Sequence, residues 1–357
     1  MARRLRAAVI GAGYWGPNLA RNFRASAEWE LAAICDLDIA RALRVSDSIG
    51  GVPVTAEFED VLADPTIDAV AIATPARTHH AVVLAALDAG KHVIVEKPVA
   101  DTRRRGVEMV ERARRNGLVL MADHTYCYTP AVLKIRELVD EGALGEILFV
   151  DSVRINLGLI QPDVDVFWDL APHDLSIMDF VLPGGLDVTS VSAHGSDPLA
   201  TGKACIGYLA MPLAGGGIAH VHVNWLSPTK IRQMVIGGTR RTLVWDDLNP
   251  QQRVSVYDRG VDLALQSKAT ADNRAANISY RLGDTWAPAL PEREALAAVV
   301  GEFAAAIREG RAARTSGDAG LRVLSVLEGA SASLRAFGAP HPVQTPVDTR
   351  EKEVQQA

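Results

Sequence analysis

A lysine that follows an apolar run is the first feature of this chain that suggests chemistry. Lys97 comes after the run 92–95 and Glu96, and Pro98 follows it. The run is typical of a buried strand, and ligands bind beyond the carboxyl ends of strands in open parallel sheets. Proline has a fixed φ and no N–H, so Pro98 directs the backbone there. Lys97 is therefore a candidate catalytic group, although a lysine that only caps a strand at the surface would have the same sequence.

A second candidate set is formed by Asp169 and His173, which lie four residues apart, one turn of a helix. A carboxylate that holds an imidazole in one tautomer is a common arrangement for acid–base chemistry. When an alcohol is oxidised, such a histidine takes the hydroxyl proton while hydride leaves the same carbon. The ammonium of Lys97 would stabilise the developing alkoxide. A helix cap beside a packed histidine fits the same two residues, and this alternative stays open.

A metal site is the rival interpretation of these residues. It would need His173 and Asp169 together with His194 or His220, and the chain has no HExxH motif or clustered triad. The three cysteines form no CxxC pair and are Cys35, Cys127 and Cys205. We expect no metal, no disulfide framework and a reducing, cytoplasmic setting.

A glycine-rich turn near the start of the chain indicates the cofactor. The strand Leu5–Ile10 runs into a G-x-G-x-x-G pattern, a helix follows, and a second strand, Glu30–Cys35, ends before Asp36. This order and spacing are typical of a dinucleotide-binding fold, in which the helix N-terminus attracts the pyrophosphate. Asp36 suits the ribose hydroxyls and repels a 2′-phosphate, so we expect NAD rather than NADP. The expected cofactor contacts are Gly11, Gly13, Tyr14, Trp15, Gly16, Asp36, Thr74, Pro75, His79, Glu96 and Lys97.

The elements that must position these residues fall into two halves. Over the first 120 residues or so, near-continuous apolar strands alternate with helices, which predicts a parallel sheet covered on both faces. After a helix over Pro130–Asp140, alternating strands separated by glycine turns predict a mostly antiparallel sheet of about six strands. We expect two strands over 147–150 and 153–156. We also expect a helix from Pro172 to Val181 and an irregular loop over 262–283. Two helices, 293–309 and 320–336, close the fold.

Length and charge set the remaining limits. With 357 residues we expect two domains: a dinucleotide-binding domain over 1–122, and a substrate-binding and oligomerisation domain over 123–340 whose terminal helices could pack back on the first. A loose tail would follow over 341–357. The net charge of −6 argues against a nucleic-acid surface. No apolar run approaches the roughly 18 residues of a membrane span, and the basic start meets the glycine turn too soon for a signal peptide.

Together, the turn 11–16, Asp36, Thr74-Pro75, Glu96-Lys97-Pro98 and Asp169-x-x-x-His173 resemble the glucose-fructose oxidoreductase/inositol dehydrogenase (Gfo/Idh/MocA) family over nearly the whole chain. The resemblance implies an α/β protein with a nicotinamide-binding Rossmann domain, followed by an α/β domain whose large open sheet commonly forms the interface of dimers or tetramers. It also implies that Lys97, Asp169 and His173 are catalytic, often with a cis peptide before Pro98. Its substrates are usually sugars, inositols or sugar nucleotides.

Three segments, 13–18, 154–158 and 168–174, look like the sugar-nucleotide branch of that family, which oxidises or reduces C3 of a UDP- or dTDP-hexose, as a UDP-glucose 3-dehydrogenase would. The expected substrate contacts are Lys97, Tyr126, Arg154, Asn156, Trp168, Asp169 and His173. Arg154 fits either a grip on an anionic substrate or a charge on the sheet surface. Some members of the branch work beside a PLP aminotransferase in antibiotic pathways of the kanosamine or aminohydroxybenzoate type. The alternatives are a free inositol or sugar dehydrogenase and a non-enzymatic NAD(P)-binding sensor.

Overall fold

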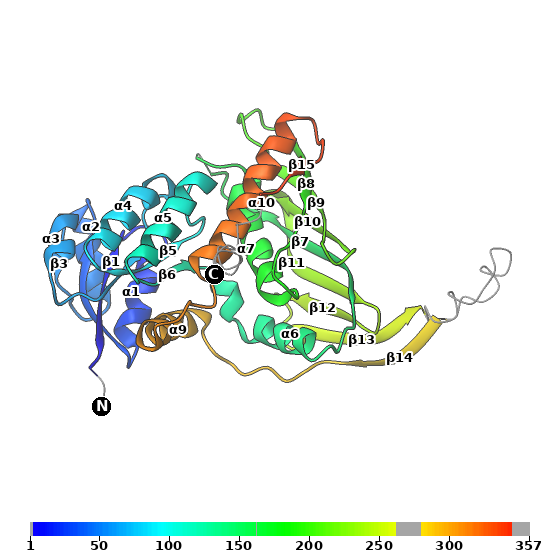
Figure 1. Cartoon of the computed structure of the whole chain (residues 1–357), viewed down its shortest axis with the longest axis horizontal. Helices are drawn as coiled ribbons and strands as arrows, with labels where there is room; N and C mark the ends of the chain where they lie inside the picture. The colour runs from blue at the N-terminus through cyan, green and yellow to red at the C-terminus, as the bar shows by residue number, and fades with distance from the viewer. Residues whose placement is uncertain (1–2, 162, 262–279, 345–357) are drawn as a thin grey trace, which may run out of the picture. The chain divides into compact units, whose positions relative to one another are not determined.

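The computed structural model describes residues 3–161, 163–261 and 280–344 (Figure 1). The chain divides into two compact units. The first joins Met1–Thr129 with Glu292–Ser325, and the second joins Pro130–Pro291 with Val326–Thr345.

The first unit is built on six parallel strands in the order β3-β2-β1-β4-β5-β6. Their bounds are β1 (Leu5–Ile10), β2 (Trp29–Cys35), β3 (Val54–Thr55), β4 (Ala69–Ile72), β5 (His92–Glu96) and β6 (Leu120–Asp123). The strands are apolar and buried because helices connect them across both faces. The order reverses at β1, and in sheets of this class ligands bind beyond the strand ends at that point.

The helices of the first unit include two segments from the end of the chain. The crossover helices are α1 (Gly16–Ala25), α2 (Ile39–Ser48), α3 (Phe58–Ala63), α4 (Ala76–Asp88) and α5 (Arg103–Arg115), and a 3-10 turn, η1 (Thr125–Tyr128), follows β6. α9 (Ala295–Glu309) packs on the same unit, since Trp29 donates a hydrogen bond to the Val300 carbonyl at 2.8 Å and stacks on Phe303. The start of α10 (Gly317–Arg335) packs on α5, where Leu321 and Leu324 lie against Gly106.

The second unit is a nine-stranded sheet in the order β14-β13-β12-β11-β7-β10-β9-β8-β15. Its strands are β7 (Ile147–Leu157), β8 (Ser190–Ser196), β9 (Ile206–Pro212), β10 (Ile218–Asn224), β11 (Leu226–Gly238), β12 (Thr242–Asp246), β13 (Val254–Val261), β14 (Tyr280–Trp286) and β15 (His341–Pro342). All neighbours are antiparallel except β7 and β10. Helix α7 (Val166–Val181) lies on β7, β10 and β9, and α6 (Pro130–Asp140) lies beside α7 (Figure 1).

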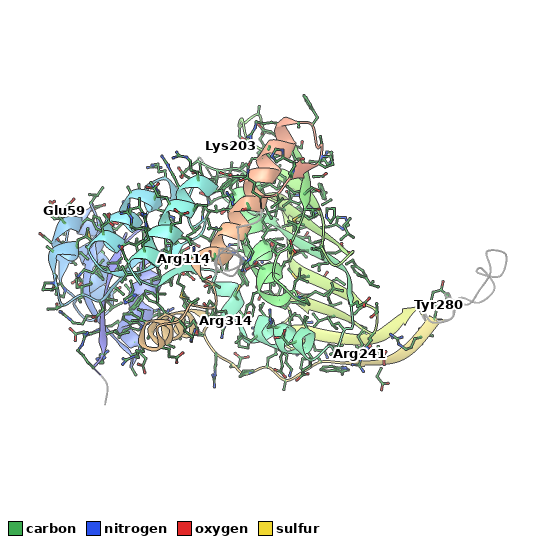
Figure 2. All side chains as sticks on the ribbon, viewed as in Figure 1. Glu59, Arg114, Lys203, Arg241, Tyr280 and Arg314 are labelled. Atoms are coloured by element: carbon green, nitrogen blue, oxygen red, sulfur yellow. The ribbon has the colours of Figure 1, made fainter. Side chains whose placement is uncertain are left out.

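The α/β class, the parallel first sheet and the mostly antiparallel second sheet are confirmed, but the second sheet is larger than predicted. Segments 147–150 and 153–156 form one strand, because Asp151 points to the exposed face and Ser152 finds a buried partner in Asp174. β14 begins at Tyr280, inside the predicted loop, and Figure 2 labels this 72% exposed residue. The rest of that loop lies outside the described residues. β15 pairs with β8 where a loose tail was expected.

The predicted start of α7 is also wrong, because the helix begins at Val166 and not at Pro172. Asp165 is the reason: its side chain accepts hydrogen bonds from the backbone N–H groups of Phe167 and Trp168, both at 3.0 Å. No helix in the described ranges is long and apolar enough to cross a membrane.

Candidate active site

Three glycines shape the turn between β1 and α1, and their surroundings differ. Gly11 has φ +98°, and an added Cβ would lie 2.7 Å from the Ala73 carbonyl. A Cβ on Gly16 would lie 2.0 Å from the Gly11 oxygen, so both positions are required by the packing of the chain itself. Beside Gly13, by contrast, no atom lies within 4 Å of an added Cβ. This open space over the backbone at the start of α1 fits the approach of a dinucleotide pyrophosphate.

Asp36, directly after β2, holds the same turn. Its Oδ2 accepts a hydrogen bond from the Ala12 N–H at 2.6 Å, and its Oδ1 accepts one from the Asp38 N–H at 2.8 Å. The Arg41 guanidinium lies 3.7 Å from Oδ1. An ionised carboxylate has about four acceptor positions, so capacity remains for ribose hydroxyls.

The two aromatic residues of the turn differ in exposure. Tyr14 is 93% exposed, whereas Trp15 stands at the N-cap of α1 and donates its indole N–H to Oδ2 of Asp123 at 3.1 Å. Asp123 ends β6 and is buried. Sequence reasoning missed Asp123, although it follows an apolar strand just as Glu96 and Lys97 do.

His79 does not take the position that the sequence suggested. Its ring is 1% exposed, and its two nitrogens lie 2.9 Å from the Pro98 carbonyl oxygen and 2.8 Å from the Thr74 carbonyl oxygen. Burial lowers the pKa of this imidazole. The expectation that His79 touches the cofactor is therefore corrected: the ring joins the turn after β4, with Thr74 and Pro75, to the turn after β5.

Lys97 follows β5 at the carboxyl edge of the parallel sheet, where it is half-buried. The Lys97–Pro98 peptide bond is cis, as the family resemblance implies. The backbone N–H of Lys97 donates to Oε2 of Glu96 at 3.2 Å. Tyr126 lies in η1, three residues beyond Asp123. These residues all belong to the first unit.

Asp169 and His173 belong to the second unit and lie one turn apart on α7, because that helix begins before both of them. Oδ2 of Asp169 accepts a hydrogen bond from the indole N–H of Trp225 at 3.0 Å. Trp225 is 1% exposed, so a rigid buried ring holds this carboxylate. Sequence reasoning missed this contact, because 56 residues separate Trp225 from Asp169 along the chain.

Two further predicted substrate contacts lie near this carboxylate in the second unit. Trp168 precedes Asp169 and donates its indole N–H to the Ser331 hydroxyl at 2.9 Å. Asn156, near the end of β7, lies against Gly158, where an added Cβ would be 2.7 Å from the Asn156 amide nitrogen and 3.4 Å from the Trp225 ring. Both side chains are half-buried.

Arg154 differs from both interpretations of the sequence. It is 2% exposed, and its Nε and Nη2 donate to the two carboxylate oxygens of Asp174 at 2.7 and 3.1 Å. Ser152 adds a third donor to Asp174 at 2.9 Å. The prediction that Arg154 binds the substrate is thus corrected: its guanidinium ties β7 to α7, and it is not a charge on the sheet surface.

Two family models match the chain. The model described as an oxidoreductase family with an NAD-binding Rossmann fold matches residues 5–124, and the model of the GFO/IDH/MocA C-terminal domain matches residues 132–244. Within the described residues, no group of three histidine, cysteine, aspartate or glutamate side chains is arranged to hold a metal.

Relatives of known activity act on different substrates. UDP-N-acetylglucosamine 3-dehydrogenase from Acidithiobacillus ferrooxidans is 28% identical over 93% of this chain and 98% of its own. A solved structure of that enzyme has a TM-score of 0.79, with 27% identity, and covers 94% of this chain and 99% of its own. D-glucoside 3-dehydrogenase from Escherichia coli is 32% identical, but over only 56% of this chain and 60% of its own. The chain is an NAD-binding oxidoreductase and belongs to the Gfo/Idh/MocA family.

Proposed function

We propose that this protein is an NAD-dependent dehydrogenase that transfers hydride between C3 of a sugar nucleotide and the nicotinamide. The observation that carries the proposal is the similarity to UDP-N-acetylglucosamine 3-dehydrogenase, which extends over 93% of the chain and so includes both Lys97 and α7. The glycine turn with its open space at Gly13, and the Asp169–His173 pair, supply the two kinds of site that this reaction requires.

In this proposal, the residues that hold the cofactor are those of the glycine turn and Asp36, and bound NAD supplies the hydride acceptor. The imidazole of His173 takes the proton of the substrate hydroxyl, and Asp169 keeps that imidazole in one tautomer. Trp225 fixes Asp169 from the buried side. The ammonium of Lys97 stabilises the negative charge that develops on the substrate oxygen.

We further propose NAD over NADP. The Asp36 carboxylate lies where the fold directs the adenosine ribose, and its charge would repel a 2′-phosphate. Arg41, 3.7 Å from that carboxylate, is its ion-pair partner and lowers the repulsion in part.

A second candidate is a dehydrogenase of free sugars or inositols. The observation that favours it is the burial of Arg154, which removes the expected cationic contact to a diphosphate. Partial matches to D-glucoside 3-dehydrogenase and to scyllo-inositol 2-dehydrogenase from Bacillus subtilis (29% identical over 55% of this chain and 58% of its own) agree with it.

NADH absorbance separates the two candidates. Purified protein with NAD is offered UDP- and dTDP-hexoses beside free inositols and glucosides, and a ketone trap removes the product. Turnover with nucleotide sugars alone supports the first candidate, and turnover with free polyols alone overturns it.

For the next step of the pathway, we propose that a PLP aminotransferase consumes the 3-ketone that this dehydrogenase forms.

For the assembly, we propose a homodimer or homotetramer formed through the open face of the second sheet. On the face turned away from α7, Tyr208 on β9, Ile218 on β10 and Ile231 on β11 are 53%, 40% and 37% exposed, so this face presents large apolar side chains to the solvent. Light scattering of the purified protein tests this proposal, and a monomer at all concentrations would contradict it.

A further inference from the structure

Two carboxyl side chains face each other at the carboxyl edge of the parallel sheet. Glu96 ends β5, Asp123 ends β6, and the two residues are direct partners in the register of these strands. Neighbouring strands lie about 4.8 Å apart, so side chains of such partners on the same face are in contact range. Two ionised carboxylates in this position would repel each other, with little water to screen the charge.

The hydrogen bonds of the pair are incomplete on one side. Asp123 accepts from the Trp15 indole at 3.1 Å and from the Thr125 hydroxyl at 2.8 Å. Oε2 of Glu96 accepts from the Lys97 N–H. Oε1 of Glu96 is buried, and no donor in the described part of the chain reaches it. A buried carboxyl oxygen without a donor is explained most simply if the carboxyl carries a proton of its own, which it can donate.

The charges around Glu96 agree with this explanation. Burial and the negative charge of Asp123 raise the pKa of Glu96 well above its usual range, and they outweigh the opposing positive charge of Lys97. Asp123 on β6 and Lys97 at the end of β5 are the charged groups that act on Glu96. His124, which follows Asp123 in the chain, is also buried.

We propose that Glu96 holds a proton that it shares with Asp123, and that this acid pair positions Trp15 in the cofactor turn and Lys97 in the turn after β5. With the proton, the pair carries one negative charge, and Glu96 donates to Asp123. Without it, a second charge appears between two turns that the cofactor must meet, and repulsion moves Asp123 away from the Trp15 indole. Glu96 and Asp123 are thus positioning residues, and only the role of Lys97 rests on the proposed function.

The direction in which pH changes NAD affinity and stability follows from the proton on Glu96. NAD affinity is expected to be highest while the pair is protonated and to fall as pH rises through the raised pKa of Glu96. The free energy of unfolding should change in the same direction. In the unfolded chain the Glu96 carboxyl ionises near pH 4.5, whereas in the folded chain it keeps its proton. The wild type therefore loses stability as pH rises from that value through the raised pKa of folded Glu96. Glu96→Gln, which is neutral at every pH and can donate to Asp123, should remove both slopes.

The test measures the NAD dissociation constant of the full-length protein from about pH 6 to about pH 9.5, without any sugar substrate. In the wild type and in the control Glu108→Gln, whose carboxylate is paired with His80 on a helix face, affinity should fall at least about tenfold over the range. In Glu96→Gln, affinity should be flat. Wild-type pH dependence retained in Glu96→Gln would overturn the proposal.

Infrared spectroscopy gives a second readout that does not depend on the variants being fully active. A protonated carboxylic acid band should be present in the wild type and in Glu108→Gln at neutral pH. It should be absent in Glu96→Gln. No such band in the wild type would overturn the proposal. Because neither measurement uses a sugar, failure of the proposed reaction and failure of the acid pair are distinguishable.

Discussion

The indole N–H of Trp225 lies 3.0 Å from Oδ2 of Asp169, one helical turn before His173. The contact joins the segment after β10 to α7, and it fixes a half-buried carboxylate through a fully buried ring. In the proposed mechanism this bond sets the direction of Asp169, and through Asp169 the tautomer of His173.

Trp225→Phe should therefore impair catalysis without affecting cofactor binding. The ring keeps most of its bulk, while Asp169 loses one donor, a bond worth about 1.5–3 kcal/mol when the acceptor is charged. We expect kcat to fall about tenfold and the NAD dissociation constant to stay unchanged. Steady-state kinetics beside NAD titration measure both. Trp245→Phe, another buried ring of the same sheet, is the matched control. Wild-type kcat in Trp225→Phe would refute the role.

Gly13→Ala and Gly16→Ala should separate cofactor binding from folding. An added methyl at Gly13 meets no atom of the protein, so the melting temperature should stay near that of the wild type while NAD binding weakens at least about tenfold. The same methyl at Gly16 would collide with the Gly11 carbonyl, so that variant should melt several degrees lower. Thermal melts with and without NAD distinguish the two. Unchanged NAD affinity in Gly13→Ala would show that the cofactor does not approach the backbone there.

Arg154→Ala should lower stability rather than substrate affinity. It leaves the Asp174 carboxylate buried without its main partner, which typically costs about 3–5 kcal/mol. Arg232, its neighbour on β11, pairs with Asp247 at 3.6 Å near the surface, so Arg232→Ala should cost no more than about 1 kcal/mol. Denaturant unfolding measures both. A stable Arg154→Ala with a raised KM only for nucleotide sugars would restore the anion-binding role.

Lys97→Ala tests the electrostatic role of the lysine. Turnover should fall by about 10²–10⁴, because the developing alkoxide loses its cation. Folding should stay near that of the wild type, since Lys97 is half-buried at the sheet edge and not part of the core. Lys91→Ala is not a suitable control, because its ammonium donates to two backbone carbonyls inside the fold. Lys134→Ala, on the surface of α6, is a better one. Full activity in Lys97→Ala would exclude the proposed role.

The local requirements of the backbone made part of the site predictable. The glycine turn, Asp36 and the position of Lys97 could be located because strand, turn and helix follow one another within a short stretch, and because Gly11 and Gly16 each have a steric reason. The spacing of Asp169 and His173 needed only a helix, although its true start depended on Asp165.

Contacts between distant segments were not predictable in the same way. Arg154 meets Asp174, and Trp225 meets Asp169, only because α7 packs on β7 and on the residue after β10. Asp123 meets Glu96 only because β6 pairs with β5, and it accepts the indole hydrogen bond only because Trp15 begins the helix after β1. Each of these partners depends on tertiary packing, which a single sequence does not contain.

The position of hydride transfer is the most direct test of the proposed function. UDP-N-acetylglucosamine that carries deuterium only at C3 is incubated with the wild-type enzyme, NAD and a ketone trap, and the reduced cofactor is analysed by mass spectrometry. We predict that the deuterium appears on the nicotinamide, and that Lys97→Ala slows its appearance. Reduced cofactor without deuterium, or reduction only with free glucosides or inositols, would contradict hydride transfer from C3 of a sugar nucleotide.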